Sequence, residues 1–273
     1  MDFDYVIVGG GSAGATLAAR LTEDPKITVC LLEAGGNGDS LLVRLPAGTV
    51  AMMPGRGKIN NWSLRTVPQP GLNGREGFQP RGRALGGSSA INAMLYVRGQ
   101  RQDYDHWADL GCDGWDWESV LPYFKRSENN ERGRDTIHGD SGPLHVSEQR
   151  SPRPITHAFV EAAKQCGIPP RNDFNDGDNE GVGLYQVTQF HDADRRGERC
   201  SAAAAYLHPI QGQRTNLTTK THVRASRILF EGKRAVGVTY KEGSTHHEVR
   251  AKREVLLAAG AFGSPQLLQL SGV

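Results

Sequence analysis

Glycines near the start of the chain have the spacing of a loop that holds a phosphate group. The pattern Gly-x-Gly-x-x-Gly directly follows an apolar run at residues 5–8 and leads into the helix-forming residues 13–21. In such a loop the first glycine makes a tight turn, the second lets the backbone approach a pyrophosphate, and the third lets the helix pack closely. The helix N-terminus then offers unpaired N–H groups and a positive dipole end. The residues expected at the phosphates are Gly9, Gly11, Ser12, Ala13 and Gly14.

The elements that must position this loop follow in the order of a dinucleotide-binding βαβ unit. Residues 26–32 predict a second parallel strand, and Glu33 stands at its end. A carboxylate about 20 residues after the glycines accepts hydrogen bonds from a ribose hydroxyl. Ala34 and Gly35 come next, so no adjacent arginine is present to hold a 2′-phosphate. This context favours an ADP-binding unit over a structural turn without a ligand.

Composition excludes several other classes of protein. With 37% hydrophobic and 23% charged residues, the 273-residue chain has the composition of a soluble globular protein. Its net charge is +2 and its basic residues are scattered without interleaved aromatics, so we expect no nucleic-acid partner. No apolar run approaches the ~20 residues of a membrane span. The four cysteines form no Cys-x-x-Cys pair, which predicts reduced thiols and no metal site.

The first strand is expected within a few residues of Met1, which leaves no room for a signal peptide. We therefore expect a cytoplasmic protein, with peripheral attachment to a membrane left open.

Two further stretches have residues suited to binding. Residues 36–80 contain many Gly, Pro and Asn, show little periodicity, and are expected to wrap a ligand. Trp62, in the middle, is expected either to contact that ligand or to anchor the loop as a buried aromatic. Residues 81–99 predict either an anion- or ring-binding loop or a serine-capped helix. The candidate binding residues there are Arg83, Gly86, Gly87, Ser88 and Asn92.

The rest of the chain predicts further strands and helices. A composition change suggests domain boundaries near residues 150 and 192. Aromatic residues between 103 and 130 predict short helices with a buried aromatic face, and residues 155–166 predict one amphipathic helix. The expected strands and last helix are a strand at 217–221, a three-stranded meander at 226–230, 235–240 and 246–251, a buried strand at 254–260, and a helix at 264–270.

Three ordered motifs resemble the glucose–methanol–choline oxidoreductases. The first βαβ unit is similar to the flavoprotein type of dinucleotide domain. Residues 83–92, Arg-Ala-Leu-Gly-Gly-Ser-Ser-Ala-Ile-Asn, resemble the first signature of that family, and residues 260–273 resemble the second. Within the family the chain looks most like the FAD-linked alcohol and choline dehydrogenases.

The resemblance implies an α/β, Rossmann-like FAD-binding domain with a meander, formed by residues 1–150 and 193–273, and part of a smaller substrate domain at 151–192. It implies oxidation of a primary alcohol, aliphatic or choline, to an aldehyde by hydride transfer to flavin N5, with a quinone as one possible electron acceptor. Ile91 occupies the position at which some members attach the flavin to a histidine, so noncovalent FAD is expected. The residues implied in FAD binding, with those above, are the backbone of Val223 and the small residues Ala259 and Gly260.

The chain departs from the family in length. Family members are about twice as long and place their catalytic histidine in the C-terminal half, beyond Val273 here. The resemblance therefore implies an N-terminal half without a catalytic residue, inactive when isolated. Three alternatives stay open: an oxidase that uses oxygen, a noncatalytic nucleotide-binding module, and a nicotinamide-dependent reductase.

Overall fold

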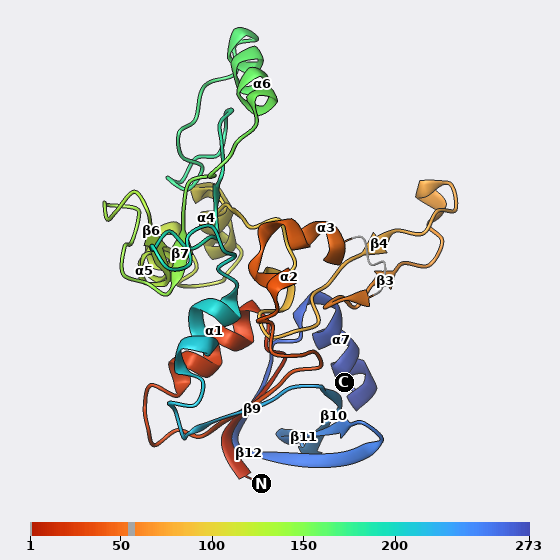
Figure 1. Cartoon of the computed structure of the whole chain (residues 1–273). Helices are drawn as coiled ribbons and strands as arrows, with labels where there is room; N and C mark the ends of the chain where they lie inside the picture. The colour runs from red at the N-terminus through yellow and green to blue at the C-terminus, as the bar shows by residue number, and fades with distance from the viewer. Residues whose placement is uncertain (1, 54–57) are drawn as a thin grey trace. The chain divides into compact units, whose positions relative to one another are not determined.

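Two compact units make up the chain, and a six-stranded sheet organises the first of them (Figure 1). The computed structural model describes residues 2–53 and 58–273. Unit 1 comprises Met1–Ala93 and Ser201–Val273, and unit 2 comprises Met94–Cys200. The units thus divide at 93/94 and 200/201, whereas composition suggested boundaries near 150 and 192. Assigning FAD binding or substrate binding to each part stays a prediction.

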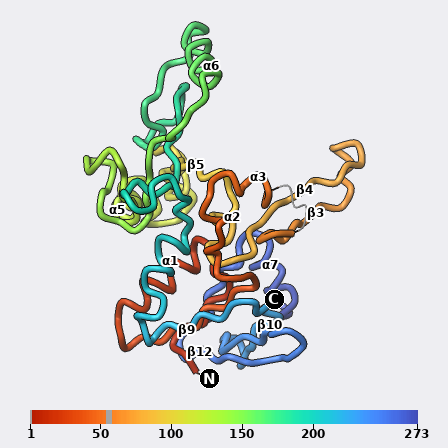
Figure 2. The backbone as a smooth tube through the Cα atoms, in the orientation of Figure 1, coloured from red at the N-terminus to blue at the C-terminus, as the bar shows by residue number. Residues whose placement is uncertain are grey.

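The sheet of unit 1 joins strands from both ends of the chain (Figure 2). Its order is β10-β11-β12-β1-β2-β9. Neighbours among β12, β1, β2 and β9 are parallel, while β10, β11 and β12 form an antiparallel meander. This confirms the expected α/β fold with a meander. The strands are β1 (Asp2–Val8), β2 (Val29–Leu32), β9 (Leu217–Lys220), β10 (Val223–Glu231), β11 (Arg234–Glu242) and β12 (Thr245–Leu257).

One expectation about this sheet was wrong. Residues 246–251 and 254–260 were expected as two strands, but β12 runs unbroken over Thr245–Leu257. Residues 245–250 pair with β11 and residues 250–257 pair with β1, with a register shift between Phe3 and Tyr5. The charged, exposed Lys252 and Arg253 interrupt the apolar pattern in the sequence. These two residues have no partner in the register with β1, and the pairing resumes at Glu254, opposite Tyr5.

Apolar side chains on one face of the sheet form the core that fixes it. Val6 and Val8 of β1 pack with Leu32 of β2 and Val238 of β11, all nearly inaccessible to solvent. Burying each such side chain stabilises the fold by about 1.5–3 kcal/mol. Helix α7 (Gly260–Ser271) adds Leu267 to this cluster. The helix begins at residue 260, four residues earlier than the sequence predicts.

Several short elements interrupt the segment expected to be irregular, residues 36–80. Residues 54–57 of that segment lie outside the described residues. The short elements of unit 1 are α2 (Leu41–Arg44), η1 (Pro46–Gly48), α3 (Thr49–Met52), β3 (Leu64–Arg65), η3 (Pro70–Leu72), β4 (Phe78–Gln79), η4 (Gly87–Ala90), η5 (Ala203–Leu207) and η6 (His208–Ile210). The first long helix, α1 (Ser12–Leu21), directly follows the glycine loop.

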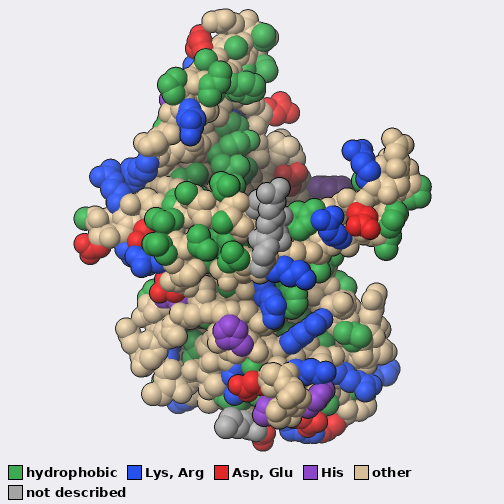
Figure 3. Space-filling model, turned by 45° about the vertical axis from the view of Figure 1, so that its right-hand side comes forward, with side chains coloured by type: hydrophobic (Ala, Val, Ile, Leu, Met, Phe, Trp, Pro, Cys, Tyr) green, Lys and Arg blue, Asp and Glu red, His purple; other side chains and the backbone are tan. Residues whose placement is uncertain are grey.

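Unit 2 contains helices with small two- and three-residue strands. Its elements are β5 (Leu95–Tyr96), α4 (Arg101–Asp109), α5 (Trp117–Ser127), β6 (Glu128–Asn130), β7 (Leu144–Val146), α6 (Pro154–Gln165) and β8 (Gln186–Val187). The aromatic face is buried only in part: Tyr104 and Trp117 are inaccessible, but Trp107 and Trp115 are about half exposed. Helix α6 has no buried residue, and apolar side chains lie on its surface (top of Figure 3). Within residues 2–53 and 58–273, no helix has the length and hydropathy to cross a bilayer.

Candidate nucleotide-binding site

Four stretches of backbone meet at the carboxyl ends of the parallel strands in unit 1. We call residues 9–14, 33–36, 82–88 and 258–260 the glycine cradle. The N–H of Gly86 donates to the carbonyl of Gly10 at 2.7 Å, and the N–H of Leu85 donates to the carbonyl of Gly36 at 2.9 Å. A Cβ atom on Gly9 would lie 2.5 Å from the carbonyl oxygen of Ala258. Ligands of open α/β sheets bind at this edge of the strands.

The loop between β1 and α1 has the geometry expected for phosphate. Gly9 has a φ of +100°, a left-handed turn that a side chain disfavours. A methyl group on Gly14 would overlap the carbonyl oxygen of Gly9, which is how α1 packs so close to β1. Among the described side chains none caps α1. Its first N–H groups, from the exposed Ser12 and Ala13, have no intrahelical acceptor and suit an anion.

Glu33 lies at the end of β2 with its carboxylate directed back at the loop. Its side chain accepts the N–H of Gly10 at 2.9 Å and the N–H of Gly35 at 2.8 Å, and the residue is 6% exposed. Burial raises the pKa of this carboxyl above its ordinary value, and the two hydrogen bonds work against that rise. A carboxylate has about four acceptor positions, so acceptor capacity remains for a ribose hydroxyl.

The neighbours of Glu33 complete this side of the cradle. Ala34 follows it at the rim, and the N–H of the buried Val223 donates to the Glu33 carbonyl at 3.0 Å. His222, for which the sequence suggested no role here, has its ring 3.3 Å from the position of a Cβ atom on Gly36. Its N–H donates to the carbonyl of Gly35 at 2.8 Å. No sequence motif marks His222 as part of the site; only its position near the strand end in the fold does so.

The second glycine loop is not a helix start. Residues 87–90 form a single 3₁₀ turn, η4, and neither serine caps it. Gly86 and Gly87 have φ values of +90° and +53°, a pair of left-handed residues that a following α-helix cannot include. Ser88 instead accepts the N–H of Gly82 at 3.2 Å. The alternative of a backbone-lined loop is therefore the better interpretation of this stretch.

The other candidate residues flank this loop. A Cβ atom on Gly87 would lie 2.7 Å from the Cα of Gly11, so the two loops touch backbone to backbone. Arg83 is exposed, and its backbone carbonyl is where a side chain on Gly35 would clash. The N–H of Asn92 donates to the carbonyl of Ser88 at 2.9 Å.

The last side of the cradle comes from the C-terminal end of β12. The N–H of Ala259 donates to the hydroxyl of Ser264 at 3.1 Å. Gly260 has a φ of +79°, is exposed, and has open space where its Cβ would be. Small side chains at this strand end leave the backbone accessible to a ligand.

Trp62 packs against arginines at the edge of unit 1. The guanidinium carbon of Arg83 lies 5.0 Å from its ring centroid, and that of Arg224 lies 5.6 Å away. These cation–π contacts anchor the loop around Trp62. Contact of Trp62 with a ligand stays a prediction.

In the described part of the chain, no three His, Cys, Asp or Glu side chains group as metal ligands. The cradle instead fits a dinucleotide on three counts. It has a helix N-terminus without a side-chain cap, a buried carboxylate at the next strand end, and glycines too close to neighbouring backbone for any side chain.

Comparisons with known proteins agree with this geometry. The family model described as GMC oxidoreductase matches residues 3–273. The chain is 44% identical over 274 residues to an alcohol dehydrogenase (acceptor) of Pseudomonas putida, covering 99% of this chain and 48% of the relative. It is 45% identical over 276 residues to an oxygen-dependent choline dehydrogenase of Pseudomonas fluorescens, covering 100% of this chain and 48% of the relative.

A solved structure agrees as well. The solved structure of an FAD-dependent oxidoreductase from Chaetomium thermophilum superposes with a TM-score of 0.90 at 36% identity, over 99% of this chain and 48% of that chain. The chain thus spans about half the length of the relatives it matches.

Proposed function

The chain belongs to the GMC oxidoreductase family, and on that premise we propose that it is the FAD-binding part of an enzyme that oxidises a primary alcohol to an aldehyde. One observation supports this most strongly: the loop at residues 9–14, Glu33 and the loop at 82–88 meet at one strand edge. The resemblance of residues 83–92 and 260–273 to the family signatures supports the same proposal.

Each part of the cradle has its own task toward FAD. The N–H groups of Ser12 and Ala13 would hold the pyrophosphate, and Glu33 would accept from the ribose of the ADP half. Gly86, Gly87, Ser88 and Asn92 would line the pyrophosphate and flavin side. When bound, FAD supplies the redox chemistry by taking a hydride at flavin N5, and the protein supplies placement. The remaining proposed contacts are Gly9, Gly11, Gly14, Ala34, Trp62, Arg83, Val223, Ala259 and Gly260.

Noncovalent attachment is part of the proposal. Ile91 is 1% exposed and has no nitrogen with which to bond a flavin. Denaturation with acid should therefore release all of the flavin from the protein.

The substrate and the electron acceptor are proposed by class alone. The names of the relatives point to an alcohol or choline as substrate and, in one case, to dependence on oxygen. An aliphatic alcohol as substrate and a quinone as acceptor come from the family resemblance. We assign no catalytic residue within the chain, because the histidine implied by the family resemblance would lie beyond Val273. An oxidase is the second candidate, since one relative is named as oxygen-dependent.

A visible spectrum of the purified chain with added FAD tests the proposal. We expect flavin bands that remain after gel filtration and appear as free FAD in the supernatant after acid precipitation. A chain that retains a nicotinamide nucleotide instead would overturn the flavin assignment. Glu33→Gln serves as the control, because a flavin bound at this site should be lost or weakened in that variant.

The reaction is tested separately, with the natural polypeptide in its full length. Alcohol-dependent reduction of a dye supports the dehydrogenase, and alcohol-dependent consumption of oxygen without dye supports the oxidase. Flavin binding without either reaction, over a range of alcohols including choline, would support a noncatalytic module.

A further inference from the structure

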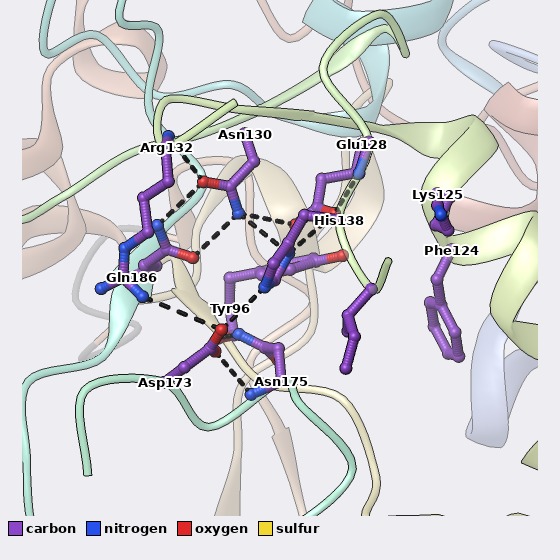
Figure 4. Close-up of polar contacts among 12 residues, drawn as sticks. Tyr96, Phe124, Lys125, Glu128, Asn130, Arg132, His138, Asp173, Asn175 and Gln186 are labelled. Carbon is purple, nitrogen blue, oxygen red and sulfur yellow. Dashed lines mark hydrogen bonds and ion pairs between the residues drawn. The ribbon is translucent and has the colours of Figure 1, made fainter. Parts of the chain in front are cut away.

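A buried cluster of charged side chains in unit 2 has no part in the proposed oxidation. Arg98, Glu128 and His138 are 3%, 0% and 2% exposed. Nη2 of Arg98 lies 2.7 Å from a carboxylate oxygen of Glu128. Nδ1 of His138 lies 3.1 Å from both oxygens of Glu128, and its Nε2 lies 2.7 Å from Oδ2 of Asp173. Figure 4 shows the imidazole between these two carboxylates.

The geometry requires a proton on both ring nitrogens of His138. A neutral imidazole has one N–H and one acceptor nitrogen, whereas ionised carboxylates only accept. The amide nitrogen of Asn130 lies 3.2 Å from Nδ1. Its two hydrogens are directed at Glu128, at 2.9 Å, and at Gln186, at 3.0 Å. Nδ1 is therefore placed to donate to Glu128 while Nε2 donates to Asp173.

The charges in the cluster balance only if His138 is cationic. Arg98 and protonated His138 then face Glu128 and Asp173, two positive groups against two negative ones. A neutral His138 would leave Asp173 with only the guanidinium of Arg132, 3.8 Å away, and would turn an unprotonated ring nitrogen toward a carboxylate oxygen.

The groups around the cluster keep the same sign balance. Asp135 accepts the backbone N–H of His138 at 2.6 Å, and the guanidinium of Arg132 lies 3.8 Å from Asp173. Burial raises the pKa of Tyr96 to about 12, so this phenol stays neutral. Burial also acts to raise the pKa of Asp135 and Asp173, but hydrogen bonds and the His138 charge outweigh it and lower both.

The cluster joins parts of unit 2 that are far apart in sequence. Glu128 begins β6, His138 follows it in a loop, Asp173 lies in the loop after α6, and Arg98 follows β5. Asn175 ties in the same loop, because its side chain accepts the N–H of Arg98 at 2.7 Å. Each of these segments is short and has little regular structure of its own.

We propose that His138 is an imidazolium at neutral pH and clamps these segments, so that unit 2 loosens when His138 loses its proton in alkaline solution. Burial by itself would lower the pKa of His138, but the hydrogen bonds and charges of Asp173 and Glu128 raise it from 6.5 to about 9. A histidine with a raised pKa stabilises the fold fully below its unfolded pKa and loses that contribution as pH rises through the folded one. The loss therefore falls between about pH 6.5 and 9.

Nitrogen-15 NMR of the histidine rings tests the protonation state in the unaltered chain. We expect one histidine to show two protonated nitrogens up to at least pH 8, with shifts that move in Asp173→Asn. The exposed His157 lies outside the cluster, and the His157→Gln variant assigns its signals as a reference. A spectrum in which every histidine becomes neutral below pH 7.5 would overturn the proposal.

Tryptophan fluorescence tests the effect on stability. In a Trp62→Phe background the remaining tryptophans, 107, 115 and 117, all lie in unit 2 and report its unfolding in urea. From pH 6.5 to 9 we expect the folding equilibrium to weaken by on the order of 100-fold. Asp173→Asn should flatten this dependence, and the matched variant His157→Gln should keep it. If stability fell with pH equally steeply in Asp173→Asn and in the parent, the clamp would be ruled out.

Discussion

The amide of Gly86 donates a hydrogen bond to the carbonyl of Gly10, 2.7 Å away. This contact joins the two glycine loops of the cradle, although they are far apart in the sequence. A second backbone contact lies next to this hydrogen bond. Gly87 approaches Gly11 so closely that a Cβ on Gly87 would lie 2.7 Å from the Gly11 Cα. The two loops therefore form one surface, and a substitution that displaces one loop should also displace the other.

Gly87→Ala should separate the loops. Alanine at a φ of +53° costs about 1–2 kcal/mol, and the overlap with Gly11 costs about 1–3 kcal/mol more. We expect lower stability in urea and loss of bound FAD. Gly71→Ala is the matched control, because nothing lies within 4 Å of its Cβ position. Unchanged flavin retention in Gly87→Ala would show that the loops need not touch.

Gly14→Ala should lower the stability of the fold, whereas Gly11→Ala should mainly weaken FAD binding. A methyl group on Gly14 overlaps the Gly9 carbonyl, so that variant should lose about 1–3 kcal/mol of stability or more. A Cβ on Gly11 would lie 3.7 Å from the Gly87 Cα, an ordinary contact, so that variant should fold. It should nonetheless bind FAD more weakly if the pyrophosphate lies against Gly11. Urea titration and flavin fluorescence separate the two effects, and equal FAD affinity in Gly11→Ala would contradict this placement.

Glu33→Gln should weaken both fold and ligand binding. The new amide presents N–H groups toward the N–H of Gly10 or Gly35, and one buried donor then lacks an acceptor, at about 1–3 kcal/mol. FAD affinity should fall about tenfold or more. Glu76→Gln, on the surface of the same unit, should change neither quantity. FAD titration by fluorescence measures the affinity, and a Kd equal to that of the parent would remove Glu33 from the binding site.

The cysteines should divide into two reactive and two unreactive thiols. Cys112 and Cys166 are exposed, while Cys30 and Cys200 are buried. Burial raises the pKa of Cys30 and of Cys200 to about 12, so neither forms thiolate at pH 8. We expect a thiol reagent to label two cysteines per chain in buffer and all four in urea. Peptide mapping that finds Cys30 or Cys200 labelled in the native protein would refute this.

The parts of the fold that depend on a few consecutive residues could be predicted from the sequence. The Gly-x-Gly-x-x-Gly loop and the carboxylate after the second strand lie where their spacing indicates, because each depends on a few consecutive residues. The continuity of β12 could not be read, since the pairing with β1 continues past two charged residues. The serine-capped helix, one of two alternatives for residues 81–99, does not form for a conformational reason: Gly86 and Gly87 both adopt left-handed backbone.

The cradle shows the same division. Gly9, Gly14 and Glu33 follow from spacing, but His222 and Ala258 enter only through the fold. The buried cluster around His138 has no sequence signal, because its charges come from four separate stretches. Burial of Arg98 and Glu128 depends on tertiary contacts that no local pattern encodes.

The pairing of β1 with β12 has a consequence for biosynthesis. Val6 lies beside Val255 in the sheet, so β1 waits for a neighbour that is made roughly 250 residues later. At 5–20 residues per second, that interval is roughly 10–50 s. Until then one edge of β1 stays open, and pairings this distant in sequence form slowly. Newly made chains should therefore need protection from edge-to-edge aggregation during that interval.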